Sequence, residues 1–350
     1  MNILEKKVKI KELWQLCFHD DERFVSLLFD RLYRDENACC MEEKGVVTTA
    51  LQMLPYCMTF GSTCLDVSYI SGASTRPEYR NRGLMSRLLV ESFNTMSFRG
   101  IPLSALIPAE PWLYGYYASK GYAPVFFRKE LNFTSAHRFN RGDYRRVFPS
   151  PDELYRFFDN RLRQRSCCVL HERNDFEVIC QDIDWDGGAV VAVADDAGQL
   201  SAVAFAVPHD ERVVVKELLS VDAQAGEAAL HEVKELYPGL PMTLYTLPEE
   251  GETSLQRMGM MRIVDVPALL SVVAGNHTLL RVTIRVTDSL LPSNNGLYLI
   301  EGGKCCRISA ERCDLDVDVA QLALLVFGDS KLSSLLDFPA VRPYMSLMLD

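Results

Sequence analysis

The hydrophobic positions of the first 135 residues follow two alternating periods, one typical of helices and one typical of strands. Apolar residues at helical spacing predict helices over 7–36 and 84–98, and Gly100 ends the second. Residues 46–55 and 65–73 are rich in β-branched and apolar side chains, which favour strands. Shorter runs predict a strand over 103–107, a helix over 111–120 and a strand over 125–133.

A similar order of elements follows roughly 140 residues further along, after an arginine-rich stretch over 134–152 that we interpret as a linker. Strands are expected over 189–194, 200–207, 212–220 and 242–247, and helices over 223–237 and 249–258. Gly259-Met260 then takes the place that Gly121-Tyr122 has in the first copy. The recurrence indicates an internal duplication, although this order of elements also recurs by chance in α/β proteins.

The last 80 or so residues have a different pattern. Strands are predicted over 279–287, 297–301 and 313–317, a turn over 292–296, and a helix over 319–327. This is the pattern of a small α+β domain. Since 350 residues are too many for one ordinary core, three domains also suit the length of the chain.

The composition is that of a folded globular protein, with 48% hydrophobic and 24% charged residues. It excludes a disordered chain, a collagen-like chain and a coiled coil. The net charge is −10, but residues 1–150 hold 20 basic and 16 acidic residues, while the remainder holds 17 and 31. An acidic chain argues against a general nucleic-acid binder. The basic first part leaves room for a small anionic ligand, or the uneven charge is only solvated surface.

The beginning of the chain is charged and does not resemble a secretory signal, and no apolar run reaches the ~18 residues of a membrane span. We therefore expect a soluble, cytoplasmic protein without membrane partners. The eleven cysteines include three adjacent pairs, Cys39-Cys40, Cys167-Cys168 and Cys305-Cys306. Adjacent cysteines lack the spacing of a zinc site, so reduced, buried thiols and no metal are expected.

One stretch between a predicted strand and a predicted helix suggests chemistry, Arg80-Asn81-Arg82-Gly83-Leu84-Met85-Ser86. A glycine lets the backbone approach a ligand closely, and the N–H groups of a helix start attract an anion. Two arginines add charge and bidentate phosphate contacts. The stretch is neither a P-loop nor a dinucleotide fingerprint. It predicts a pyrophosphate cradle, with a basic loop and a helix-capping glycine as the alternative.

In its context, this stretch resembles the acetyl-CoA signature of the GCN5-related N-acetyltransferases (GNAT superfamily), Q/R-x-x-G-x-G/A. Arg80 and Gly83 match the signature, whereas Met85 stands where a small residue is usual. The resemblance implies that Ala73, Ser74 and Thr75 lie along the pantetheine arm. It places Asn81, Arg82, Gly83, Leu84, Met85 and Ser86 around the pyrophosphate, beside Arg80.

A second match is Tyr117, four residues before the pair Gly121-Tyr122. The family has a tyrosine at this place, near the thioester sulfur. The resemblance implies that the phenol of Tyr117 protonates the departing thiolate. The alternative is that Tyr117 is one more aromatic residue of a cluster with Tyr114 and Tyr116 that packs a helix.

The whole chain is similar to the enhanced-intracellular-survival type of this superfamily. That type implies a tandem GNAT fold, with a mixed central sheet and flanking helices in each copy, followed by a sterol-carrier-protein-like α+β domain. We expect a catalytic domain over 1–135, a degenerate copy over 136–267 and the third domain over 268–350. The second copy lacks Arg-x-x-Gly over 220–230, and Leu255 stands in the place of Tyr117.

The resemblance also implies that the terminal carboxylate, here on Asp350, is a catalytic base; a frayed terminus is the alternative. The predicted function is transfer of an acetyl group from acetyl-CoA to a primary amine, on a small molecule or a peptide, within a ternary complex. The acidic second half would suit a cationic acceptor. Ring assemblies occur in the family, which leaves a homo-oligomer open. The alternative function is a non-catalytic ligand- or lipid-binding protein on a GNAT scaffold.

Overall fold

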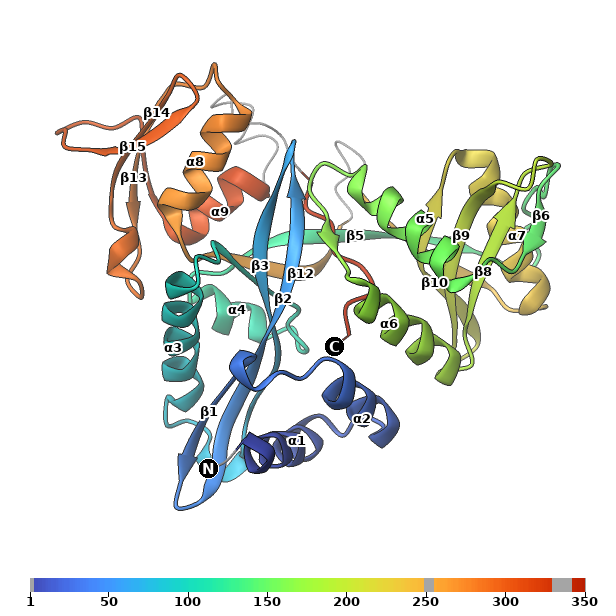
Figure 1. Ribbon diagram of the computed structural model, residues 1–350, viewed down its shortest axis with the longest axis horizontal. Coiled ribbons are helices and arrows are strands. Elements are labelled where there is room, and N and C mark those ends of the chain that lie inside the picture. Colours follow the sequence, from blue (N-terminus) through green and yellow to red (C-terminus); the bar gives the residue numbers. More distant parts are fainter. Residues whose placement is uncertain (1–2, 249–254, 329–341, 350) are drawn as a thin grey trace. The chain divides into compact units, whose positions relative to one another are not determined.

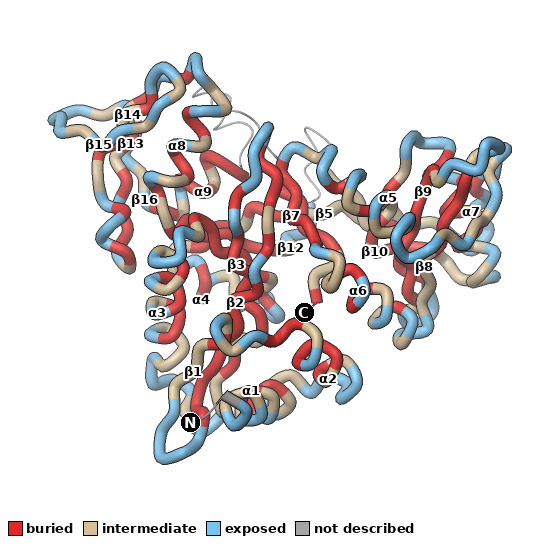
Figure 2. The backbone as a smooth tube through the Cα atoms, in the orientation of Figure 1, coloured by how far each residue is buried: buried red, intermediate tan, exposed pale blue. Residues whose placement is uncertain are grey.

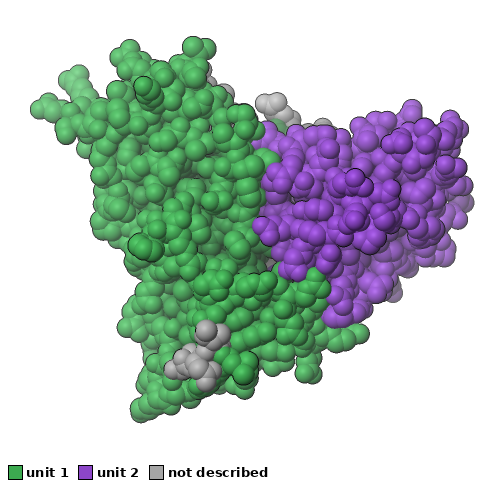
Figure 3. Space-filling view, viewed as in Figure 1, with its two compact units in different colours: residues 1–126, 257–343, 350 green, residues 127–256, 344–349 purple. Residues whose placement is uncertain are grey.

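The computed structural model describes residues 3–248, 255–328 and 342–349. The chain divides into two compact units, which Figure 3 shows in different colours. Unit 1 comprises residues 1–126, 257–343 and 350, and unit 2 comprises residues 127–256 and 344–349. The chain therefore leaves unit 1 after residue 126 and returns to it at residue 257.

The first stretch of unit 1 contains helices on either side of long antiparallel strands (Figure 1). Its elements are α1 (Ile3–Phe18), α2 (Glu22–Arg31), η1 (Asp35–Asn37), β1 (Ala38–Glu43), β2 (Val46–Phe60), β3 (Thr63–Thr75), η2 (Pro77–Tyr79), α3 (Leu84–Phe98), β4 (Leu103–Leu106), α4 (Leu113–Ala118) and β5 (Ala123–Phe133). Residues 127–133 of β5 already belong to unit 2.

The sheet of unit 1 has the strand order β1-β2-β3-β4-β12, where β12 (Gln256–Ile263) follows unit 2 in the sequence. β3 and β4 are parallel, and the other neighbours are antiparallel. Residues of β2, β3, α3 and α4 share one buried hydrophobic cluster, which includes Leu51, Ile70, Phe93 and Tyr117. Figure 2 shows these strands buried along most of their length. This cluster holds α3 and α4 against the strands that precede them.

β3 bulges at Gly72 and Ala73, where two of its residues stand opposite one residue of β2. Gly72 has φ +60°, and a side chain at this position would overlap the indole of Trp14 in α1. The ladder between β3 and β4 joins residues 67–69 to 103–105, so the last six residues of β3 extend past it. The bulge thus re-aims the end of β3, and it lies directly before the residues that the sequence assigns to the cofactor.

The second stretch of unit 1 forms a separate four-stranded sheet of order β15-β14-β13-β16, in which only β13 and β16 are parallel. α8 contacts β14 and β15, and α9 contacts β13 and β16. The elements are α8 (Val266–Asn276), β13 (Val282–Thr287), η3 (Pro292–Asn294), β14 (Gly296–Glu301), β15 (Lys304–Ile308), β16 (Leu315–Asp318) and α9 (Val319–Phe327). A capping box between Asp318 and Gln321 begins α9.

Unit 2 repeats the plan of the first stretch. Two helices precede an antiparallel set of strands, a helix follows, and the next strand, β11, runs parallel to β10. Its sheet has the order β5-β11-β10-β9-β8-β6. Its elements are β6 (Arg145–Val147), α5 (Pro151–Arg163), β7 (Val169–Leu170), α6 (Arg173–Trp185), β8 (Ala189–Ala194), β9 (Leu200–His209), β10 (Arg212–Ser220), α7 (Ala223–Leu236) and β11 (Met242–Thr246).

The predicted fold class, a mixed α/β architecture with a repeated unit and a small C-terminal α+β part, is confirmed. α3 and α9 begin and end where the sequence predicts. The expected helix over 249–258 is wrong at its end, since residues 256–258 open strand β12. Gly259 and Met260 therefore lie inside a strand rather than after a helix, because pairing with β4 overrides the local pattern. Residues 249–254 lie outside the described part.

The structure also contains elements that the pattern did not indicate, chiefly α5 and α6. The stretch over 134–152 is packed rather than a plain linker, since it supplies strand β6 and the buried Phe139. All eleven thiols are free, but only Cys167 and Cys168 are buried, while Cys64 and Cys306 are exposed. No helix among the described residues is long and apolar enough to cross a membrane.

We predict that Gly72→Ala lowers the free energy of unfolding by about 2–4 kcal/mol, from a left-handed backbone and the overlap with Trp14. Gly100→Ala is the matched control, because Gly100 has φ +73° and no atom within 4 Å of an added Cβ. It should cost only about 1 kcal/mol. Urea unfolding of the two variants checks this, and equal losses would show that the indole contact contributes nothing.

Candidate active site

The predicted cofactor residues of β3 lie at the end of the strand, just past the bulge. Ser74 is buried, and its carbonyl accepts a hydrogen bond from Thr49 Oγ1 at 2.8 Å. The carbonyl of Thr75 accepts from Arg80 Nε at 3.2 Å, and its hydroxyl lies 2.9 Å from that of Thr49. Ala73 packs against the hydrophobic cluster. These contacts hold the end of the strand in one conformation beside the loop that follows.

The loop between η2 and α3 brings two backbone positions of positive φ together, Asn81 at +62° and Gly83 at +72°. Gly83 is the N-cap of α3, which has no side-chain cap. A Cβ at Gly83 would meet nothing within 4 Å, so open space lies over this helix end. Arg80 and Arg82 are both exposed. Free helix N–H groups, positive charge and open space are what an anion requires.

Arg82 has partners of its own. It lies 3.7 Å from Glu43 and stacks over the ring of Tyr79 at 4.8 Å. Both side chains of the ion pair are about half exposed, so the pair is weak and exchanges readily for a stronger anion. Arg80 makes its hydrogen bond to Thr75 through Nε. This hydrogen bond connects the loop to the end of β3.

The first turn of α3 connects the loop to α4. The side chain of Met85, the residue that departs from the family signature, packs against the hydrophobic cluster, so its bulk is taken up on the core side. Ser86 Oγ lies 3.2 Å from the hydroxyl of Tyr116 in α4. Leu84 begins the helix. The contact between Ser86 and Tyr116 connects the start of α3 to the helix that carries Tyr117.

Tyr117 is 7% exposed and packs edge-on against Tyr116 and Tyr122. Among the described residues its hydroxyl has no hydrogen-bond partner, whereas that of Tyr122 pairs with Ser104 at 2.7 Å. Burial, and to a smaller degree the neighbouring Tyr116, raises the pKa of Tyr117 above its ordinary value. Tyr117 is therefore a neutral phenol throughout the neutral pH range.

Unit 2 has a strand, loop and helix of the same kind at β10 and α7, but the start of its helix is capped by a side chain. Asp222 is the N-cap of α7, and its carboxylate accepts a hydrogen bond from the N–H of Ala225 at 2.8 Å. A carboxylate at this place both satisfies the helix end and repels an incoming anion. Of the two equivalent helices, α3 is the one whose start is free of such a carboxylate.

The structure thus brings the predicted residues of β3, the loop, α3 and α4 together in unit 1. Asp350 lies outside the described residues. Two residues that the sequence did not single out also shape this site: Trp14 under the bulge and Thr49 beside Ser74. They carry no motif, so only their contacts reveal them. Tyr116, named in the sequence only as part of an aromatic cluster, lies beside Ser86. No group of metal-ligating side chains is found in the part of the chain that the structure describes.

Comparisons with known proteins agree with this geometry. Residues 5–125 match the family model of the acetyltransferase (GNAT) domain, and residues 266–346 match that of the sterol carrier protein domain. Among curated protein sequences, none matches the chain. The GNAT match spans β3, the loop, α3 and α4, so it contains every candidate residue described above except Asp350.

Several solved structures share the fold over nearly the whole length of the chain. A conserved protein from Enterococcus faecalis, a probable N-acyltransferase, has a TM-score of 0.80 at 15% identity, with 98% of this chain and 97% of that chain covered. Eis1 from Mycobacterium abscessus has a TM-score of 0.77 at 14% identity, covering 99% and 97%. A GCN5-related N-acetyltransferase from Anabaena variabilis has 0.78 at 15%, covering 97% and 96%. At these identities the likeness is one of fold.

Residues 5–125 therefore form an acetyltransferase domain of the GNAT type, and residues 266–346 form a sterol carrier protein domain. The predicted resemblance to the enhanced-intracellular-survival type is confirmed in architecture. The protein is an acyltransferase of the GNAT class.

Proposed function

We propose that this acyltransferase moves an acetyl group from acetyl-CoA to a primary amine of a small molecule or peptide. The observation that supports it most is the open start of α3 at Gly83, flanked by Arg80 and Arg82 and linked to the helix of Tyr117. One end of this arrangement suits a pyrophosphate, and the other presents a neutral phenol. A cofactor that joins a pyrophosphate to a thioester through an extended arm would need both.

In this proposal the pantetheine arm follows Ala73, Ser74 and Thr75, and residues 80–86 bind the pyrophosphate. The end of β3 supports this arrangement, because residues 70–75 extend past the ladder with β4. Met85 suits it as well, since its side chain packs toward the core. The backbone N–H groups of α3 would then be the donors that meet the phosphate oxygens.

Binding the amine beside the thioester removes much of the entropic barrier to their reaction. The amine must lose a proton to attack, and we propose the terminal carboxylate of Asp350 as the base. Backbone N–H groups near Ser74 and Thr75 would stabilise the oxyanion that develops on the thioester carbonyl. Tyr117 would then donate its phenolic proton to the departing CoA thiolate.

We place the reaction in the cytoplasm, because eleven free thiols, two of them exposed, suit a reducing compartment. The acidic excess of residues 151–350 favours a cationic acceptor, such as a polyamine, an aminoglycoside or a lysine side chain. A screen of amines with acetyl-CoA, following the released thiol, tests the proposal. If none of the amines in the panel causes release of thiol from acetyl-CoA, the proposal is contradicted.

A second candidate function is binding of an apolar ligand by the C-terminal domain. The match to the sterol carrier protein domain favours it. Lipid extracted from the purified protein, together with no detectable CoA binding, would make this the main function. Lipid found alongside amine-dependent thiol release would make it an additional one.

We predict that Tyr117→Phe lowers kcat for acetyl transfer by roughly 10²–10⁴-fold and leaves the Kd of acetyl-CoA unchanged, since only the proton donor is removed. Steady-state kinetics and calorimetric titration measure the two quantities. Tyr114→Phe, in the same helix and also partly buried against the cluster, is the matched control and should keep wild-type kcat. An unchanged kcat in Tyr117→Phe would remove this phenol from the mechanism.

We predict that Arg80→Ala raises the Kd of CoA about tenfold, because an exposed charge-assisted contact to phosphate is lost. Arg23→Ala removes the same charge from an exposed ion pair with Asp21 in the α2 region, and it should leave the Kd unchanged. Titration calorimetry with CoA checks both. Equal Kd values for the two variants would mean that the loop does not bind the cofactor.

We predict that kcat shows no descending limb below about pH 10. A general acid acts only while protonated, and burial moves the pKa of Tyr117 upward, so the donor is retained as the pH rises. The ascending limb reports deprotonation of the amine and its base. A profile of kcat from pH 6 to 9.5 checks this, and a descending limb that disappears in Tyr117→Phe would contradict it.

A further inference from the structure

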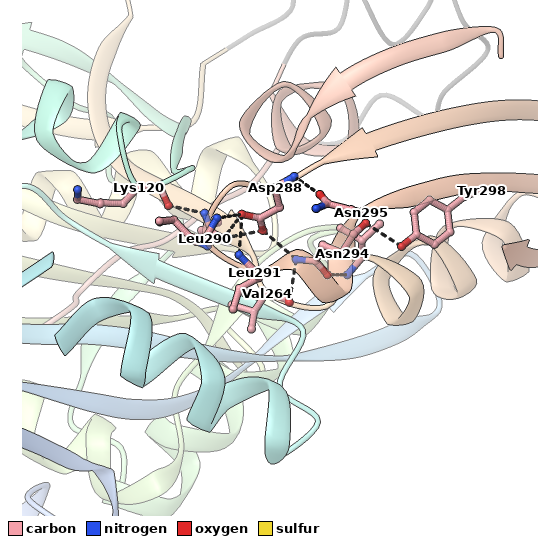
Figure 4. Close-up of polar contacts among 10 residues, drawn as sticks. Lys120, Val264, Asp288, Leu290, Leu291, Asn294, Asn295 and Tyr298 are labelled. Carbon is pink, nitrogen blue, oxygen red and sulfur yellow. Dashed lines mark hydrogen bonds and ion pairs between the residues drawn. The ribbon is translucent and has the colours of Figure 1, made fainter. Parts of the chain in front are cut away.

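A fully buried cation lies at the centre of unit 1, outside the residues considered so far. Arg262 in β12 is buried, and its Nη2 donates to both carboxylate oxygens of Asp288, at 2.8 and 2.6 Å (Figure 4). Each of the two side chains is 1% exposed. Asp288 follows β13, so it belongs to the segment that matches the sterol carrier protein domain. The ion pair therefore joins the main sheet of unit 1 to this segment.

The carboxylate of Asp288 is fully occupied. It also accepts hydrogen bonds from the N–H groups of Leu290 and Leu291 and from Nδ2 of Asn294. Burial alone would raise its pKa, but the hydrogen bonds and charge of Arg262, together with Asn294, outweigh burial and lower the pKa below its usual value. Asp288 is thus an anion at neutral pH, which is what a buried guanidinium requires.

The other side of Arg262 holds the end of α4. Its Nη1 donates to the carbonyl of Lys120, and its guanidinium lies 4.6 Å over the ring of Phe93. Gly121 is required next to it, because a side chain there would overlap Nη1. The remaining nitrogen of Arg262, Nε, has no partner among the described residues.

The turn that Arg262 holds is the one that positions Tyr117. The N–H groups of Lys120 and Tyr122 both donate to the carbonyl of Tyr117, at 2.8 and 3.2 Å. The N–H of Gly121 donates to the carbonyl of Ala118 at 3.0 Å. A cation bonded to the carbonyl of Lys120 therefore restrains the last turn of α4, one turn from the phenol. Proton transfer depends on such placement to within a fraction of an ångström.

We propose that Arg262 is a positioning residue for Tyr117, and that Asp288 supplies the counter-charge, so that the C-terminal segment completes the active site. The proposal rests on the proposed function of Tyr117 as proton donor. A purely structural ion pair would behave otherwise, because exchange of a buried pair for hydrophobic residues of similar volume is often neutral or stabilising. A positioning pair cannot be exchanged in this way without loss of activity, because a methionine side chain cannot donate a hydrogen bond to the carbonyl of Lys120.

The test is the double variant Arg262→Met/Asp288→Leu. We expect the urea midpoint to fall, because the N–H groups of Leu290 and Leu291 and the amide of Asn294 lose their acceptor. In the folded double variant the Kd of CoA should be unchanged, and kcat should fall at least tenfold. Deuterium exchange of the peptide over residues 117–123 should become faster, because the turn loses its restraint. Wild-type kcat in a folded double variant, or an equal loss in CoA binding and in kcat, would overturn the proposal.

Further variants keep the test decisive if the double variant does not fold. Arg262→Lys keeps the charge but has one nitrogen for two partners, so kcat should fall and exchange over 117–123 should rise, with CoA binding retained. Ile300→Val, a core change in β14, is the control for general loosening and should leave both readouts unchanged. If the wild type transfers no acetyl group, the proposed function fails. The exchange rates then still decide whether Arg262 holds this turn.

Discussion

A guanidinium without exposed surface persists in a protein only if its charge and most of its N–H groups are satisfied nearby. In unit 1 this requirement joins three parts of the chain that are far apart in sequence: the turn after α4, strand β12 and the loop after β13. None of the three satisfies Arg262 alone. The arrangement of the candidate active site therefore depends on the chain returning from unit 2, and on the first loop of the C-terminal sheet.

One difference between the two copies of the repeated plan lies at the start of a helix. In the first copy Gly83 leaves the start of α3 without a side-chain cap, and in the second Asp222 closes α7 with a carboxylate. The difference is a matter of one residue, yet it reverses the electrostatic preference of the helix end for an anion. The end of β3, which extends past its ladder with β4, adds the second requirement. Together, the uncapped start of α3 and the extended end of β3 distinguish the candidate site of the first copy from the equivalent place in the second.

Much of the fold and of the candidate site was predicted because the relevant signals are local. The periodicity of α3 and its flanking glycines mark the helix and its ends, and the loop from Arg80 to Gly83 shows its chemistry in four adjacent positions. The errors occur where distant pairing decides. Residues 256–258 open strand β12, whose later residues 260–263 pair with β4. α5 and α6 are amphipathic, but their polar faces weaken the hydrophobic pattern.

The sequence by itself determined most helices and strands of the first domain and the place of the loop from Arg80 to Gly83 before α3, since period, capping and glycine placement act within a few residues. Only the tertiary structure decided which groups surround them. It placed Trp14 under Gly72, Tyr116 beside Ser86, and Arg262 between Lys120 and Asp288. These contacts are not written in any local pattern, because each depends on strands and loops that meet only when the sheet has formed.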